Sequence, residues 1–180
     1  CLNFRVAVHR PQGTRLGLEL DLTDGMTACV VQVAAGVVQE FNERAGDGPR
    51  LRPCDCIVAV NGSGGNAESI LRSLQEEEDL CIEVRRPRTL KVSIPAAEGS
   101  LGVRVIYGIT GSSLFVNGIL PGRVEAFNRS NTSRRDNGEV RAKDRIFCVN
   151  GVHGERDGPR ALLDALKDPG QKDLVVLRLD

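Results

Sequence analysis

Few side chains in this sequence have the types and spacing that enzyme chemistry needs. The two histidines, His9 and His153, both stand in loop-like stretches that contain Gly or Pro. No G-x-S-x-G motif is present to hold a nucleophilic serine. The Gly-rich stretch NGSGGN (61–66) lacks the Lys and Ser/Thr of a phosphate-binding P-loop. We therefore expect no catalytic activity in this chain.

The cysteines do not form a metal-binding pattern either. Cys54 and Cys56 are a C-x-C pair, and the second pair that a zinc site requires is absent. Four cysteines lie in apolar, strand-like runs, where a thiol behaves as a small hydrophobic side chain: Cys29, Cys56, Cys81 and Cys148. We expect reduced intracellular thiols, no metal site and no cofactor.

Overall charge and composition argue against a nucleic-acid partner. Lys plus Arg and Asp plus Glu both total 24, so no net field attracts a polyanion. Five Phe, one Tyr and no Trp offer few platforms on which bases could stack. Two local basic clusters, RRPRTLK (85–91) and SRRDNGEVRAKDR (133–145), are either solvated surface or a weak contact for anionic lipid headgroups.

No segment addresses the chain to a membrane or to secretion. No apolar run approaches the roughly 18 residues of a spanning helix, and no signal-peptide pattern is present. We expect a cytoplasmic protein, associated with membranes only through its partners. Since the chain begins at Cys1, we expect it to be a fragment of a longer protein.

An internal repeat defines the elements that must position any binding site. The octapeptide DCIVAVNG (55–62) returns as DRIFCVNG (144–151). Upstream, GVVQEFN (36–42) matches GRVEAFN (122–128), and LGLEL (16–20) matches LGVRV (101–105). Matched blocks in the same order indicate a duplication. We expect two domains, residues 3–86 and 88–180.

Hydrophobic spacing predicts the same elements in both repeats. Alternating apolar residues at 4–8, 16–22 and 28–33 predict strands, with an Asp-Gly turn between the last two. Helical spacing predicts a short helix near 36–42 and a longer one after Asn66, a suitable N-cap. The order is therefore β-β-β-α-β-α-β, or the same order with one further, very short strand. Hairpin connections exclude a parallel sheet.

The order of these motifs resembles that of a PDZ domain, present twice. The most specific blocks are the two octapeptides, and RLGLEL and SLGVRV look like the carboxylate-binding loop of that family. The resemblance implies a mainly β fold with two helices per domain (α+β), as two small, partly open antiparallel β-barrels or sandwiches in tandem. It gives the octapeptide a role in the fold, with Ile57, Val60, Ile146 and Val149 in the core.

The resemblance also implies capture of C-terminal or internal extended peptides by β-strand addition, between the second strand and the long helix. Backbone N–H groups around the loop glycine would hold a carboxylate, and apolar side chains would line the pocket for the last peptide residue. The predicted peptide-binding residues of repeat 1 are Arg15, Leu16, Gly17, Leu18, Leu20, Ala67, Leu71 and Leu74. Those of repeat 2 are Leu101, Gly102, Val103, Val105, Pro159, Leu163 and Leu166.

Both repeats depart from the best-known form of the family, which often has His at the start of the long helix and selects Ser or Thr in the peptide. Ala67 and Pro159 stand there, so we expect an apolar residue two places before the peptide terminus. Arg15 precedes the loop of repeat 1, whereas Ser100 precedes that of repeat 2. We therefore expect repeat 1 to bind carboxylates more strongly.

The sequence thus predicts a non-catalytic, tandem protein-interaction module whose partners are C-terminal peptides ending in an apolar residue. Two alternatives stay open. One is a phospholipid- or membrane-surface module of the same fold. The other is a regulatory segment of a larger enzyme, such as a protease, with its catalytic part elsewhere.

Overall fold

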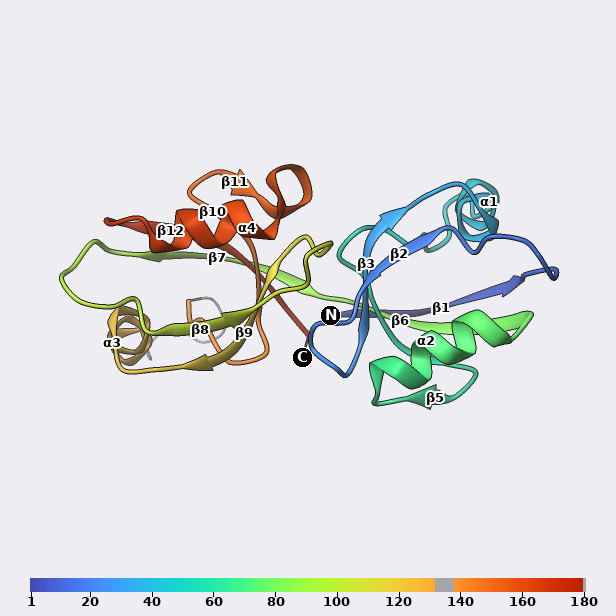
Figure 1. Cartoon of the computed structure of the whole chain (residues 1–180), viewed down its shortest axis with the longest axis horizontal. Coiled ribbons are helices and arrows are strands. Elements are labelled where there is room, and N and C mark those ends of the chain that lie inside the picture. Colours follow the sequence, from blue (N-terminus) through green and yellow to red (C-terminus); the bar gives the residue numbers. More distant parts are fainter. Residues whose placement is uncertain (132–137, 180) are drawn as a thin grey trace. The chain divides into compact units, whose positions relative to one another are not determined.

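The structure is a computed structural model that describes residues 1–131 and 138–179. Its contacts divide the chain into two compact units, Cys1–Pro87 and Arg88–Asp180. Only Pro87 separates the last strand of unit 1 from the first strand of unit 2. Figure 1 shows unit 1 in blue to green and unit 2 in green to red.

Unit 1 is an open antiparallel sheet with two helices. Its strands are β1 (Leu2–His9), β2 (Leu18–Asp21), β3 (Ala28–Val33), β4 (Cys56–Val60), β5 (Ser63–Gly64) and β6 (Asp79–Arg86). The helices are α1 (Val37–Arg44) and α2 (Ala67–Glu76). The strand order is β1-β6-β4-β3-β2, with β5 paired to β4, so β1 and β2 are the two edges.

Unit 2 repeats this topology (Figure 1). Its strands are β7 (Arg88–Ile94), β8 (Val103–Ile106), β9 (Leu114–Ile119), β10 (Arg145–Val149), β11 (Val152–His153) and β12 (Lys172–Arg178). The helices are α3 (Arg123–Ser130) and α4 (Gly154–Lys167). The order β7-β12-β10-β9-β8 leaves β8 at an edge, as β2 is in unit 1. The predicted fold class is confirmed, and neither sheet closes into a barrel.

The long helices begin as local sequence chemistry requires. The Asn66 side chain accepts hydrogen bonds from the N–H groups of Glu68 and Ser69, so the predicted N-cap is confirmed. Helix α4 begins earlier than expected, at Gly154, and is interrupted at Gly158, whose φ is 82°. Pro159 then opens the continuing helical part, where its missing N–H costs no hydrogen bond.

The repeated octapeptide forms the central strands β4 and β10. The four apolar residues predicted for the core, Ile57, Val60, Ile146 and Val149, are fully buried. No helix in the described part of the chain is long and apolar enough to cross a membrane.

The polar ends of the octapeptide hold the last strand of each unit. Asp144 accepts hydrogen bonds from Nε and Nη2 of Arg178 at 2.7 and 2.8 Å. Asp55 receives the same two bonds from Arg86 at 2.7 and 2.8 Å, and this hydrogen bonding raises the pKa of Arg86. At the other end, Asn61 Oδ1 accepts from Cys81 N–H in β6. Asn150 Oδ1 likewise accepts from Asp173 N–H in β12.

The prediction of reduced thiols is wrong for two cysteines, because Cys29 and Cys56 form a disulfide. They are direct neighbours across β3 and β4, with a Cα–Cα distance of 4.0 Å. In unit 2 the equivalent neighbours are Phe115 and Arg145, and the Arg145 guanidinium lies over the Phe115 ring. The pairing of strands brings the two thiols together, and sequence spacing alone does not reveal it.

We expect reduction of the Cys29–Cys56 bond to destabilise unit 1 selectively. The bond closes a loop with a sequence separation of 27. A loop of that length corresponds to about 3.5 kcal/mol of stabilisation in the chain-entropy model. Hydrogen exchange with and without a phosphine reductant measures the change. Equal loss of protection in the two units would contradict this expectation.

We also expect Asp144→Asn to destabilise its unit more than Asp55→Asn does. The substitution removes the carboxylate charge opposite the arginine, and the cost of breaking such a pair rises with burial, to roughly 3–5 kcal/mol for a fully buried pair. Side-chain exposure is 6% for Arg178 and 26% for Arg86. Urea titration monitored by amide exchange in each unit tests the order. Equal losses would show that burial of the arginine does not control the effect.

Candidate functional site

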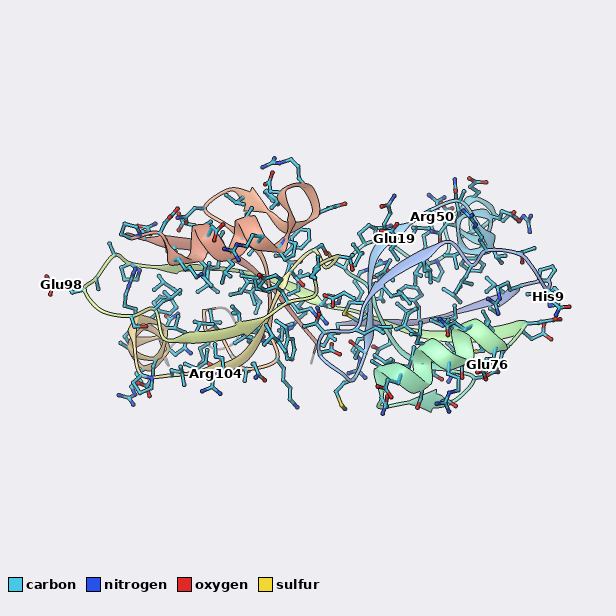
Figure 2. All side chains as sticks on the ribbon, in the orientation of Figure 1. His9, Glu19, Arg50, Glu76, Glu98 and Arg104 are labelled. Atoms are coloured by element: carbon cyan, nitrogen blue, oxygen red, sulfur yellow. A yellow bond between two sulfur atoms is a disulfide. The ribbon has the colours of Figure 1, made fainter. Side chains whose placement is uncertain are left out.

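The edge strands β2 and β8 offer an unpaired side to an added strand. Each pairs on one side only, β2 with β3 and β8 with β9. Their side chains alternate, so that Leu18 and Val103 are half-buried while Glu19 and Arg104 are exposed. Figure 2 labels these two charged residues on the two edge strands. The unpaired edges therefore combine open backbone groups with opposite outward charges.

The loop before each edge strand turns on a glycine in the left-handed region. Gly17 has φ +80° and Gly102 has φ +74°. A Cβ at Gly17 would lie 2.6 Å from the Ala34 carbonyl oxygen, and one at Gly102 would lie 2.6 Å from that of Leu120. Both the turn and the close backbone approach therefore require glycine.

The carbonyl groups of this loop are used by the helix that follows β3 or β9. The N–H groups of Val37 and Val38 donate to the carbonyls of Arg15 and Leu16. In unit 2, Arg123 and Val124 donate in the same way to Ser100 and Leu101.

The loop amides are therefore left for other partners. Within the described residues, the N–H groups of Leu16 and Gly17 donate no hydrogen bond. The Gly102 N–H donates to Ser100 Oγ at 3.2 Å, a long bond. Such a loop is a backbone nest with N–H groups that suit an anion.

Unit 2 has a cavity of about 590 Å³ between this loop, β8 and α4. It brings together six of the seven residues predicted for repeat 2: Leu101, Gly102, Val103, Val105, Leu163 and Leu166. The seventh, Pro159, is buried and does not line the cavity. The cavity is therefore apolar along its strand and helix sides, and has backbone N–H groups at its loop end.

The equivalent residues of unit 1 lie in the same elements. Leu16, Leu18 and Leu20 are partly buried and pack against the core cluster that contains Leu74. Leu71 is half-buried on α2. Ala67 is buried, and its N–H donates to the Gly25 carbonyl in the β2–β3 turn.

Arg15 lies beside a different hollow from the one predicted. A cavity of about 680 Å³ is formed between β1 and α1, and Arg15 lines it together with Val8, Phe41 and Arg44. Unit 2 has a smaller counterpart, of about 370 Å³, between the end of β7 and α3. Arg15 is exposed, so water competes with any anion for its guanidinium.

Two cations of unit 2 were not predicted as site residues. Arg123 lines the 590 Å³ cavity, and its Nη2 donates to the carbonyls of Pro95 and Gly170 at 2.6 and 2.7 Å. Lys172 is 1% exposed at the start of β12. Unit 1 has Val37 and Leu80 at these places. When the two repeats are aligned, Arg123 and Lys172 each stand where the other repeat has an apolar residue. This difference could have identified both cations from the sequence.

The far end of the unit 2 groove carries its own polar contact. The side chain of Tyr107, which follows β8, is hydrogen-bonded to Arg160 on α4. This bond, together with the Asp164 carboxylate, raises the pKa of Arg160 above its ordinary value. The pair connects the strand side and the helix side of the groove.

The basic cluster at 85–91 is partly used by the fold, because Arg86 pairs with Asp55. The other cluster, at 133–145, lies partly outside the described residues, which resume at 138. No group of three or more metal-ligating side chains occurs within residues 1–131 and 138–179.

No family model and no curated protein matches this sequence. A solved structure of INAD PDZ45 in complex with NG2 peptide is 16% identical, covering 98% of this chain and 89% of that chain with a TM-score of 0.38. A complex of INAD PDZ45 and NORPA CC-PBM is 13% identical, covering 98% and 91% with a TM-score of 0.40. Each unit has the strand order, helix positions and glycine loop that were predicted from its sequence.

The glycine loop gives a direct test of its packing. We expect Gly17→Ala to destabilise unit 1 more than Gly13→Ala. Both residues have positive φ, which costs an alanine roughly 1–2 kcal/mol. Only at Gly17 does the new Cβ meet backbone atoms, whereas nothing lies within 4 Å at Gly13. Thermal unfolding of the two variants measures the difference. Equal shifts in Tm would mean that the loop accommodates the new Cβ with no loss of stability.

Proposed function

We propose that this chain is a non-catalytic tandem module that captures extended peptides through their C-terminal carboxylate. The peptide adds to β2 or β8 as a further antiparallel strand, because those edges carry unpaired main-chain groups. Its terminal carboxylate accepts hydrogen bonds from the loop N–H groups. The observation that carries the proposal is the 590 Å³ cavity of unit 2, which joins an open edge, a backbone nest and an apolar helix side.

The lining of the groove supports an apolar terminal residue in the peptide. Val103, Val105 and Leu166 surround the place that this side chain would occupy in unit 2. Leu163, one turn earlier on α4, also lines this cavity. An apolar side chain two places before the terminus therefore fits better than Ser or Thr, whose hydroxyl would lose its bond to water.

The lipid-surface alternative has less support. A membrane-binding cluster needs cations that are available to headgroups. In the junction cluster, Arg86 is already held by two hydrogen bonds to Asp55 and by one to the Arg50 carbonyl. We propose that peptides are the main partners.

The proposal is tested by titrating the intact chain with a matched pair of peptides. Both end in Val with Leu two places before it, and one carries a free carboxylate while the other is amidated. Charge-assisted hydrogen bonds contribute roughly 1.5–3 kcal/mol, so we expect amidation to weaken binding by about tenfold or more. Backbone ¹⁵N–¹H spectra locate the site, with shifts expected at Leu16–Leu18 or Leu101–Val103.

A third peptide ending in Asp serves as the control for the apolar pocket, and it is expected to bind weakly. Equal binding of the carboxylate and amide forms would contradict capture of the terminus. Shifts confined to the β1–α1 or β7–α3 side would contradict the choice of groove.

A further inference from the structure

We propose that Lys172, two residues after the Gly170 carbonyl that Arg123 binds, is the residue that makes the unit 2 groove selective for a free carboxylate. This inference rests on the proposed function and deepens it. It assigns a role to a side chain that is neither in the glycine loop nor on the long helix. It also reverses the ranking expected from Arg15, because it makes unit 2 the more carboxylate-dependent of the two grooves.

The first argument is the environment of Lys172. Its side chain is 1% exposed, and its Nζ has no hydrogen-bond or ion-pair partner anywhere in residues 1–131 and 138–179. A buried ammonium without a partner is strongly unfavourable, so such a group is retained only with a compensating interaction. An incoming carboxylate supplies one.

The second argument is the side of the sheet on which Lys172 lies. Along β12 the residues at 172, 174 and 176 are buried, while Asp173 is exposed. Lys172 therefore points to the core face, together with Leu174 and Val176. Asp173 points away from the core, and its carboxylate accepts hydrogen bonds from the side chains of Ser93 and Gln171. These hydrogen bonds lower the pKa of Asp173.

The third argument is that Arg123 ties the surroundings of Lys172 to the carboxylate loop. Arg123 N–H donates to the Ser100 carbonyl at the start of the loop. Its guanidinium donates to the Gly170 carbonyl, two residues before Lys172, and to that of Pro95. Pro95 follows Ile94, the register partner of Lys172 on β7. Lys172 does not itself line the 590 Å³ cavity, but Gly170, two residues earlier, does, so the lysine begins its strand next to the loop end of that cavity.

Arg123 also has an unused donor, because its Nε is buried and has no acceptor within the described residues. The acidic groups nearby do not neutralise the pair. Asp168 lines the same cavity but is exposed. Glu98 is exposed in the loop between β7 and β8 (Figure 2). The buried ammonium of Lys172 and the half-buried guanidinium of Arg123 therefore leave an excess of positive charge near the loop end of the unit 2 groove.

Unit 1 provides an internal comparison for this assignment. Leu80 stands at the place of Lys172, paired with Val8 as Lys172 is paired with Ile94. Val37 stands at the place of Arg123 in the aligned GVVQEFN and GRVEAFN blocks. The same fold is thus built with apolar residues at both positions, so the cations of unit 2 are not required by the topology.

The test uses Lys172→Met, which keeps an unbranched chain of similar length, and Lys172→Leu, which installs the unit 1 residue. The probes are the carboxylate-ended and amidated peptides described above, read at the unit 2 loop amides of the intact chain. We expect both variants to weaken carboxylate binding in unit 2 about tenfold, with binding of the amidated peptide unchanged. Binding at the unit 1 loop stays the same.

The matched control is Lys167→Met, which removes an exposed cation that lines the same cavity. Its effect should be smaller and should vanish in high salt, whereas that of Lys172→Met should persist, since salt screens exposed charges more than buried ones. Equal effects of the two variants would overturn the assignment, and so would an unchanged carboxylate-to-amide ratio in Lys172→Met. If the parent chain binds neither peptide at β2 or β8, the proposed function itself fails.

Discussion

The central strand of each unit is fixed at both ends to the last strand, and the positions of the other elements follow from this connection. At one end Asp55 or Asp144 holds the arginine that closes β6 or β12. At the other end the Oδ1 of Asn61 or Asn150 accepts a hydrogen bond from a backbone N–H near the start of the same strand. Side chains from one octapeptide therefore set the register over the length of the strand. The strands β3 and β9 pair against it, and the edges β2 and β8 follow.

The geometry of the glycine loop depends on a second, local constraint of the backbone. The first turn of α1 or α3 takes the carbonyl groups of the glycine loop, so the loop cannot turn its amides toward the helix. The carbonyl groups of the loop are thus hydrogen-bonded to the helix, while its N–H groups stay available. A nest of this kind is prepared before a ligand arrives, which lowers the ordering cost of binding an anion.

Much of this arrangement could be predicted from sequence, because it rests on local patterns that occur twice. The repeat, the strand and helix order, the Asn66 cap and the burial of Ile57 and Ile146 are all signalled within short windows. The Cys29–Cys56 disulfide could not be predicted in this way, since it depends on which strands pair across a separation of 27. The place of Arg15 depends on the direction of an exposed side chain next to α1, which spacing does not determine. The course of α4 before Pro159 depended on the positive φ of Gly158.

The duplication shows which positions of the fold are open to change. Where unit 1 has a covalent pair at Cys29 and Cys56, unit 2 has Arg145 over Phe115. Where unit 1 has Leu80 in its core, unit 2 buries Lys172. Both differences give unit 2 a buried cation, Arg145 or Lys172, where unit 1 has an uncharged residue, and the strand order is the same in the two units. Apolar burial favours the free unit, and a buried cation favours the state in which an anion is bound. Under the proposed function, the apolar residue at this place stabilises unit 1 itself, whereas the buried lysine of unit 2 contributes free energy when an anion binds.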